Sequence, residues 1–295
     1  MPKRSPFTRL CGSLAALGPP PRADLHTHST ASDGAFTPSQ VVARARAARL
    51  CAVALTDHDT LAGVPEARDA ARDSGVEVIP AVEISTAFAG REFHLLGYFV
   101  REDHDELSAA LARLCAARRE RYYSFVSALR ARGLALPADR AEVLERGTHS
   151  AGRRHVAALL VACGHATTVH EAFRRFLGAA SASATPKELV PVGEAIRLVR
   201  AAGGVASLAH PPDDLSDEHV GALAGMGLGA LEAAYRWPKS SLASRWRATA
   251  ARFGLAVSGG SDCHGPVPAA HGVGSHWVSA AELEALRERA GCGGR

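Results

Sequence analysis

The 295-residue sequence predicts an α/β fold built on parallel strands, and two observations point to it. Short apolar runs alternate with helical segments over 23–102 and again over 190–295. Such alternation is typical of parallel strands joined by right-handed helical crossovers. The stretch between them, 103–189, carries a helical pattern only, so we expect a helical insertion within the α/β unit.

The first part of the unit begins with a short strand that closes at Leu25. A helix start follows, with Thr37 as N-cap, Pro38 at the first helical position and Gln40 completing a capping box. The helix that begins there extends to about residue 50. The next expected elements are a strand over 51–56, a helix over 64–73, a strand over 76–82 and a strand over 93–100.

The insertion is predicted from apolar residues at three-, four- and seven-residue spacings or sums of them. They are Leu107, Leu111, Leu114, Tyr122, Phe125 and Leu129. Further helices are expected over 139–146, 153–163 and 168–177, followed by a linker of small residues over 178–184.

Alternation resumes in the last part of the chain, where Gly203 and Gly204 end the first helix. The expected helices cover 192–202, 216–225, 240–253 and 279–290, and the expected strands cover 205–209, 229–235 and 255–258.

Composition bounds the class of protein. Hydrophobic residues make up 47% of the chain, enough for a sizeable core and against global disorder. The net charge of +4 favours anionic substrates weakly. The six cysteines form no C-x-x-C pair, so we expect a reduced, cytoplasmic protein. No apolar run is long enough to span a membrane, and residues 1–22 are expected to form a disordered leader.

Metal-type side chains follow the strand-like runs. His26, Asp57-His58, Glu83, His210 and Asp262-Cys263-His264 each stand at the C-terminal end of one. Because parallel strands of an α/β fold end on one face, we expect these segments to converge there. In extended chain, His26 and His28 also point the same way and can reach one point in space.

The gathered donors are six imidazoles and four carboxylates, more than one tetrahedral ion needs. We therefore expect two or three divalent ions, with Mn²⁺ favoured and Fe²⁺ or Zn²⁺ as alternatives, since all accept nitrogen and oxygen ligands. The set is His26, His28, Asp33, Asp57, His58, Glu83, His94, His210, Asp262 and His264.

Six motifs together carry a family resemblance: DLHTHSTASDG, LTDHDT, EIS, FHLLGY, AGGVASLAHP and GGSDCHG. The chain resembles the PHP (polymerase and histidinol phosphatase) family of metal-dependent phosphoesterases. It is most similar to the subgroup of nucleoside 3′,5′-bisphosphate phosphatase and ribonuclease AM, which carries a helical insertion with a G-R-P-H motif. Here the motif is Gly152-Arg153-Arg154-His155, so an arginine replaces the proline.

This resemblance implies a distorted (β/α)7 TIM-like barrel with a trinuclear site. The first ion would take His26, His28, Glu83 and Asp262. The second would share Glu83 and add His94 and His210, and the third would use Asp33, His58 and His264. Asp57 has no ligand place, and we expect it to orient a ligand imidazole. Arg153 and His155 would bind a substrate phosphate.

The expected reaction is hydrolysis of a phosphate ester by a metal-bound hydroxide, with His210 assisting the departing oxygen. The favoured substrates are 3′,5′-bisphosphonucleotides, losing the 3′-phosphate, and short 5′-phosphorylated RNA, degraded 5′→3′. The alternatives are a phosphatase that acts on another metabolite, such as histidinol phosphate, and an inactive metal-binding module. No membrane or obligate protein partner is expected. Arg118, Arg119 and Arg121 are expected on a solvated helix face, and Trp246 in packing or on a base.

Overall fold

The computed structural model describes residues 20–181, 184–236, 241–266 and 272–291. Residues 1–19 of the expected leader lie outside this part, and Arg22 already begins the first strand. In the described residues, no helix has the length and apolar character needed to cross a bilayer.

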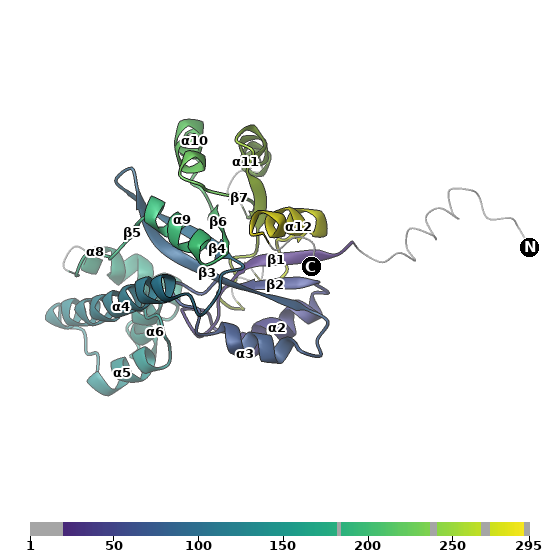
Figure 1. Cartoon of the computed structure of the whole chain (residues 1–295). Helices are drawn as coiled ribbons and strands as arrows, with labels where there is room; N and C mark the ends of the chain where they lie inside the picture. Colours follow the sequence, from purple (N-terminus) through teal and green to yellow (C-terminus); the bar gives the residue numbers. More distant parts are fainter. Residues whose placement is uncertain (1–19, 182–183, 237–240, 267–271, 292–295) are drawn as a thin grey trace, which may run out of the picture.

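The core of the molecule is a mixed sheet that curls into a nearly closed barrel (Figure 1). The strand order is β8-β7-β6-β4-β3-β2-β1-β9, and a bridge between Thr27 and Cys263 links the β1 side to the segment after β8. The expected α/β barrel is thereby confirmed. The strands are β1 (Arg22–Thr27), β2 (Ala52–Leu55), β3 (Glu77–Phe88), β4 (Arg91–Tyr98), β5 (Val190–Pro191), β6 (Val205–Leu208), β7 (Ala230–Ala234), β8 (Ala256–Gly259) and β9 (Val278–Ser279).

Strand β4 departs from the expected parallel pairing, because it runs antiparallel to both β3 and β6. The reason lies in the connection to β3. Only Ala89 and Gly90 separate the strands, both with positive φ (48° and 73°), and such a two-residue turn reverses the chain into a hairpin. Strand β3 also continues past Glu83 to Phe88 instead of ending there.

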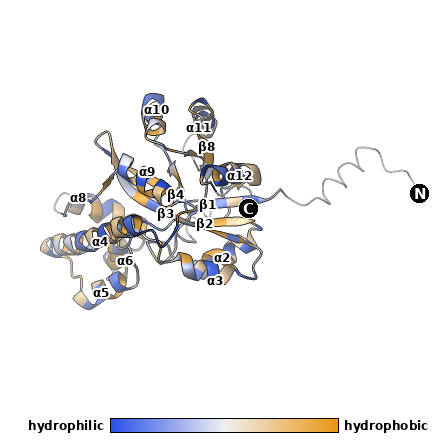
Figure 2. Cartoon of the chain, viewed as in Figure 1, coloured by the Kyte–Doolittle hydropathy of each residue, from blue (hydrophilic) through white to orange (hydrophobic). Residues whose placement is uncertain are grey.

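Helices pack around the barrel where the sequence predicts them. Helix α2 begins with the expected capping box between Thr37 and Gln40. Figure 2 shows hydrophilic and hydrophobic residues mixed along α9 and α4, as expected for helices with one face against protein. The helices of this part are α2 (Pro38–Ala47), α3 (Val64–Ala71), α9 (Val192–Ala201), α10 (Asp217–Gly225), α11 (Ser241–Arg252) and α12 (Ala280–Arg289).

The helices between β4 and β5 lie together beside the barrel (Figure 1). They are α4 (Asp105–Ala131), α5 (Ala138–Arg146), α6 (Arg153–Ala162), α7 (Val169–Ala172), a π-helical turn η1 (Phe173–Leu177) and α8 (Gly178–Ser181). The small-residue stretch expected to be a linker is therefore helical at its start, because alanine is a strong helix former. Residues 182–183 of that stretch lie outside the described part.

Helix α4 connects two apolar cores. Leu107 and Leu114 in its first half belong to the core formed with β3, β4 and α9. Tyr122 and Phe125 in its second half belong to the core formed with α5, α6 and α7. Trp246 is fully buried in the barrel's core, so it serves packing and cannot stack on a base.

Candidate metal centre

The strand ends bring the predicted metal-type side chains together at one mouth of the barrel. His26 lies in β1 and is fully buried, and its carbonyl accepts a hydrogen bond from Asp262 N–H at 2.8 Å. The two segments meet this closely because Gly260 has no side chain: a Cβ there would lie 2.3 Å from His26 N. The local sequence Gly-Gly-Ser-Asp thus fixes where Asp262 stands.

Glu83 is the centre of the cluster. Its side chain is buried inside the barrel mouth, and both oxygens face imidazole nitrogens. Five of the six predicted histidines lie within 3.5 Å of a Glu83 oxygen. They are His26 (3.5 Å), His28 (3.3 Å), His58 (3.0 Å), His94 (2.8 Å) and His210 (3.1 Å).

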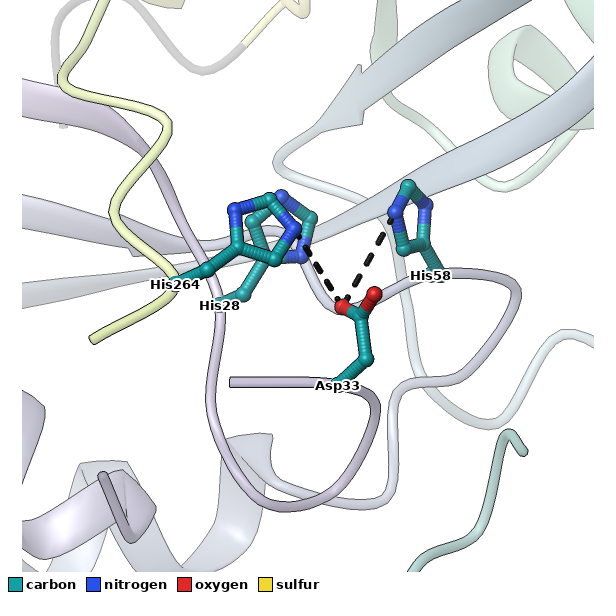
Figure 3. Close-up of side chains that lie close together, drawn as sticks. All are labelled: His28, Asp33, His58 and His264. Carbon is teal, nitrogen blue, oxygen red and sulfur yellow. Dashed lines mark ion pairs between the residues drawn. The ribbon is translucent and has the colours of Figure 1, made fainter. Parts of the chain in front are cut away.

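A second cluster of imidazoles surrounds Asp33 (Figure 3). Its Oδ1 lies 3.3 Å from His264 Nε2 and 3.9 Å from His58 Nε2. His28 stacks against His264 with ring centroids 4.0 Å apart. Side chains of residues that follow β1, β2 and β8 thus meet around the Asp33 carboxylate.

Four groups of donors are compact enough to hold an ion, and together they contain all nine expected ligands. They are His28–Asp33–His58–His264, His26–His28–Asp262, His26–Glu83–His210 and His58–Glu83–His94. The division differs from the one implied by the family resemblance. His28 belongs to the Asp33 group as well as to the Asp262 group, and His58 also joins Glu83 and His94.

The donor atoms fit divalent ions. Six buried nitrogen and oxygen atoms of the cluster have no hydrogen-bond partner: His26 Nε2, His28 Nδ1, His28 Nε2, Asp33 Oδ1, His58 Nδ1 and Glu83 Oε2. Buried polar atoms without partners are costly and need a ligand to compensate. Bonds of about 2.1 Å also hold neighbouring ligand atoms about 3.0–3.4 Å apart. The His28–Glu83 and His28–Asp262 spacings of 3.3 and 3.1 Å are of this size.

Electrostatics keep the carboxylates charged. Burial alone would raise the pKa of Glu83, but the neighbouring His58 and His94 hold it well below its usual range. Burial lowers the pKa of His28, yet the neighbouring Asp262 and Glu83 carboxylates raise it to about 10. For His58, burial prevails and lowers the pKa to about 4. Ionised carboxylates beside imidazoles are a suitable set for a cation, which would displace protons on binding.

Two of the expected ligands stand in strained backbone. His210 has φ of 26° and Asp262 has φ of 51°, in the left-handed region that non-glycine residues rarely occupy. Such strain persists only where surrounding contacts hold it, and it is common at functional sites.

Asp57 does not orient an imidazole, contrary to the sequence-based expectation. Its carboxylate instead accepts hydrogen bonds from Ser29 N (2.7 Å), Ser29 Oγ (2.6 Å) and Ser32 Oγ (2.5 Å). These serines precede Asp33 in the same loop. Asp57 therefore holds the loop that carries the predicted ligand Asp33.

Two buried carboxylates around the centre were missed by the sequence analysis. Glu232, in the middle of β7, lies 3.0 Å from His26 Nδ1 and accepts from His210 N–H at 2.6 Å. Asp24, in β1, accepts from Ser261 N and Gly274 N at 2.9 and 2.7 Å, and burial raises its pKa to about 6. In both cases the signal present in the sequence was an acidic residue within an otherwise apolar strand-like run.

A cavity of about 230 Å³ opens beside the cluster, between the barrel and the insertion helices. Its wall includes the expected ligands Asp33, His58 and His94. Five cationic side chains also line it: Arg118, Arg121, Arg153, Arg154 and Lys187.

Arg118 is not on a solvated face, contrary to expectation. Its side chain is 12% exposed and forms an ion pair with the fully buried Asp59, and it donates to Ser85 Oγ at 3.0 Å. Arg121 is half-buried, and burial together with the Arg153 cation lowers its pKa. Arg119, in contrast, is 60% exposed, as expected. The spacing of residues along a helix could not reveal that the barrel covers one side of it.

The two expected phosphate-binding residues occupy different positions. Arg153 lines the cavity and also a second depression beside His94 and His210. His155 is not among the described residues that line either one. Its Nδ1 accepts from Gly152 N–H at 3.0 Å, and burial lowers its pKa. Arg154, at the place of the family's proline, donates to Asp33 O at 3.2 Å.

This arrangement can hold cations next to a cationic cavity, which suits an anionic substrate bound across both. Comparison with known proteins agrees with that chemistry. Residues 24–154 match the PHP domain family. The 5′-3′ exoribonuclease of Haemophilus influenzae is 35% identical over 82% of this chain and 90% of its own length.

The 3′,5′-nucleoside bisphosphate phosphatase of Chromobacterium violaceum is 30% identical over 85% of this chain and 90% of its own. A solved Bifidobacterium adolescentis protein, described as a metal-dependent phosphoesterase, is 31% identical with a TM-score of 0.84, covering 94% of this chain and 99% of its own. The motifs, the barrel and these relatives agree: the chain belongs to the PHP family of metal-dependent phosphoesterases.

Proposed function

We propose that this enzyme hydrolyses phosphate esters of nucleotides: the 3′-phosphate monoester of nucleoside 3′,5′-bisphosphates, and the first phosphodiester at the 5′ end of short RNA, which releases a nucleoside 5′-monophosphate. The observation that carries the proposal is the cationic cavity that opens directly onto the ligand cluster. One phosphate would lie at the cluster while a second, on the same nucleotide, lies against Arg153 and its neighbours. A substrate with one phosphate would leave that second position without a partner.

The centre would hold two or three divalent ions, Mn²⁺ being favoured, through His26, His28, Asp33, His58, Glu83, His94, His210, Asp262 and His264. Such ions supply Lewis acidity: they neutralise charge developing on phosphate oxygens and lower the pKa of water. Glu83 joins the donor groups, since its two oxygens face histidines from several strands.

His210 would assist the departing oxygen through the ion that it holds, since a ring nitrogen bound to an ion carries no proton to donate. Its side chain is 29% exposed, the largest value among the six imidazoles of the cluster, so it can reach a bound ester. Its backbone N–H is held by Glu232, and its Nε2 lies 3.1 Å from Glu83. Arg153 would position a phosphate by charge-assisted hydrogen bonds.

The proposed compartment is the cytoplasm. The described cysteines, at 51, 115, 163 and 263, are all free. Free thiols fit a reducing environment, which supports this proposal, and we propose that the enzyme acts there on small nucleotides without an obligate protein partner.

The test is release of phosphate from adenosine 3′,5′-bisphosphate and histidinol phosphate, and of nucleoside 5′-monophosphate from 5′-phosphorylated trinucleotide RNA, using the full chain stripped with a chelator and reloaded with Mn²⁺. We expect turnover of the first two. His26→Ala and Asp262→Ala should each lose more than about 100-fold, since even outer-shell partners of a metal cost about 10–100-fold. His170→Ala, an exposed histidine of α7, is the control.

Arg153→Gln should raise the KM for the bisphosphate by about tenfold or more, because it removes charged hydrogen bonds. The KM for a nucleoside monophosphate should change less. Preferential turnover of histidinol phosphate would support the alternative of a phosphatase that acts on another metabolite. No turnover of any substrate would support an inactive metal-binding module.

A further inference from the structure

Glu232 is a charged residue in the interior of the barrel. It occupies the middle of β7, between Leu231 and Ala233, and its exposed fraction is 0%. A buried carboxylate is costly unless its oxygens are hydrogen-bonded. Both oxygens are used: Oε1 lies 3.0 Å from His26 Nδ1, and Oε2 accepts from His210 N–H at 2.6 Å. One side chain therefore contacts two expected ligands, one in β1 and one in the segment just after β6.

The contact with His26 fixes a tautomer. A carboxylate accepts hydrogen bonds, so His26 Nδ1 must carry the proton, and in the neutral ring Nε2 is then the free acceptor. His26 Nε2 points into the cluster, 3.4 Å from Asp262 Oδ1 and 3.5 Å from Glu83 Oε2, and it has no hydrogen-bond partner. Glu232 thereby leaves the correct nitrogen available to an ion.

The hydrogen bond from His210 N–H to Glu232 stabilises the backbone conformation of His210. His210 has φ of 26°, a conformation that costs on the order of 1–3 kcal/mol for a non-glycine residue. Its N–H bond to Glu232 offsets part of that cost. In this conformation the ring stacks on His26, with centroids 5.7 Å apart, and Nε2 reaches Glu83 at 3.1 Å. The group His26–Glu83–His210 is one of the four compact donor groups.

We propose that Glu232 is a positioning residue of the metal centre. It selects the Nδ1–H tautomer of His26 and holds the strained backbone of His210, so that both rings present Nε2 to the same ion. This inference rests on the ligand assignment above. A glutamine could not replace Glu232, because its amide offers one acceptor oxygen and one donor NH₂. Either His26 would meet a donor and take the other tautomer, or His210 N–H would lose its acceptor.

The first measurement uses the wild-type chain loaded with Zn²⁺, a diamagnetic ion, and labelled with ¹⁵N-histidine. Long-range ¹H–¹⁵N spectra distinguish Nδ1–H from Nε2–H, and the His26 signals are assigned by their loss in His26→Gln. We expect Nδ1–H for His26. A predominant Nε2–H tautomer would overturn the proposal, and this measurement needs no Glu232 variant to fold.

The second measurement compares metal affinity, by calorimetric competition with a chelator, between the wild-type chain and Glu232→Gln. We expect Zn²⁺ and Mn²⁺ affinity at one site to fall about 10- to 100-fold, with a shift of the His26 signals towards Nε2–H. Glu145→Gln is the matched control, since Glu145 is buried on α5 and pairs with Arg119 away from the cluster. Unchanged affinity and tautomer in Glu232→Gln would contradict the proposal.

A third arm separates this inference from the proposed function. If the wild-type chain binds ions but turns over none of the substrates above, the proposed function fails while the role of Glu232 is still decided by affinity. Glu232→Asp keeps two acceptor oxygens on a shorter side chain, and we expect it to recover part of the lost affinity. Affinity no higher than that of Glu232→Gln would show that acceptor chemistry is not what matters.

Discussion

A buried arginine ties the long helix α4 to the barrel. Arg118 forms an ion pair with Asp59, which is fully buried and also accepts from Ser85 N–H at 2.7 Å. Removing one partner of a buried pair leaves an uncompensated charge and costs about 3–5 kcal/mol. We therefore expect Arg118→Met to lower the free energy of unfolding by about 3 kcal/mol, measured by urea denaturation.

Two further variants test this reason. Arg113→Met, at an exposed position of the same helix, should change stability by less than about 0.5 kcal/mol. Adding Asp59→Asn to Arg118→Met should restore part of the loss, because the unpaired charge is gone. A loss below about 1 kcal/mol in Arg118→Met would argue against a buried pair.

At the scale of single residues, the sequence indicated which metal-type side chains converge at the barrel mouth, but not the residues that hold them. The candidate residues His26, Glu83 and Asp262 can be identified because each stands at the end of an apolar run, which is a local pattern in the sequence. Glu232 acts on a residue 206 positions away, and Arg118 acts on one 59 positions away. Such partners depend on strand neighbours and helix packing, which no local spacing encodes.

Among the elements, the connection between α5 and α6 holds the ligand loop after β1. Thr148 Oγ1 donates towards Ser32 O and Ala31 O at 2.7 and 3.0 Å, and His149 N–H also donates to Ala31 O. Asp33 is the next residue of that loop. The insertion thus supports the loop of the predicted ligand Asp33 directly, in addition to lining the cavity.

Thr148→Val should loosen this support with little change in shape. We expect a stability loss of about 1 kcal/mol from the lost hydrogen bonds. The affinity for one divalent ion should also fall about tenfold, as for other outer-shell partners of a metal site. Calorimetric titration with Mn²⁺ measures the affinity.

The control is Thr167→Val, since the Thr167 hydroxyl binds only Glu171 on an exposed face. Equal metal affinity in Thr148→Val and the wild-type chain would show that the loop holds Asp33 without help from the insertion.

Element types were largely predictable, whereas the direction of β4 was not. Capping at Thr37 and the apolar spacing along α4 are local signals, and both appear in the structure. The reversal after Phe88 depends on a two-residue turn at Ala89 and Gly90, and alanine is an unusual residue for positive φ. The pairing of β4 with β6 also joins segments separated by the whole insertion.

For the whole molecule, metal loading should raise stability. Six buried nitrogen and oxygen atoms of the cluster have no hydrogen-bond partner among the described residues, and ions that bind only the folded state stabilise it by mass action. We expect Mn²⁺ at about 100 times its Kd to add about 2.7 kcal/mol, seen as a higher Tm than with chelator. His28→Gln should lose most of this increase, since His28 belongs to two donor groups.

His170→Gln, exposed on α7, should respond to Mn²⁺ as the wild-type chain does. A Tm that stays the same with Mn²⁺ and with chelator would count against ion binding at the barrel mouth.

The continuity of α4 also constrains how the gene can change. This helix of 27 residues belongs to the barrel's core at one end and to the insertion's core at the other. A recombination junction within it would have to match helical phase, apolar contacts and the Arg118–Asp59 pair at once. We therefore expect that exchange of the insertion between relatives succeeds only when all of α4 travels with it.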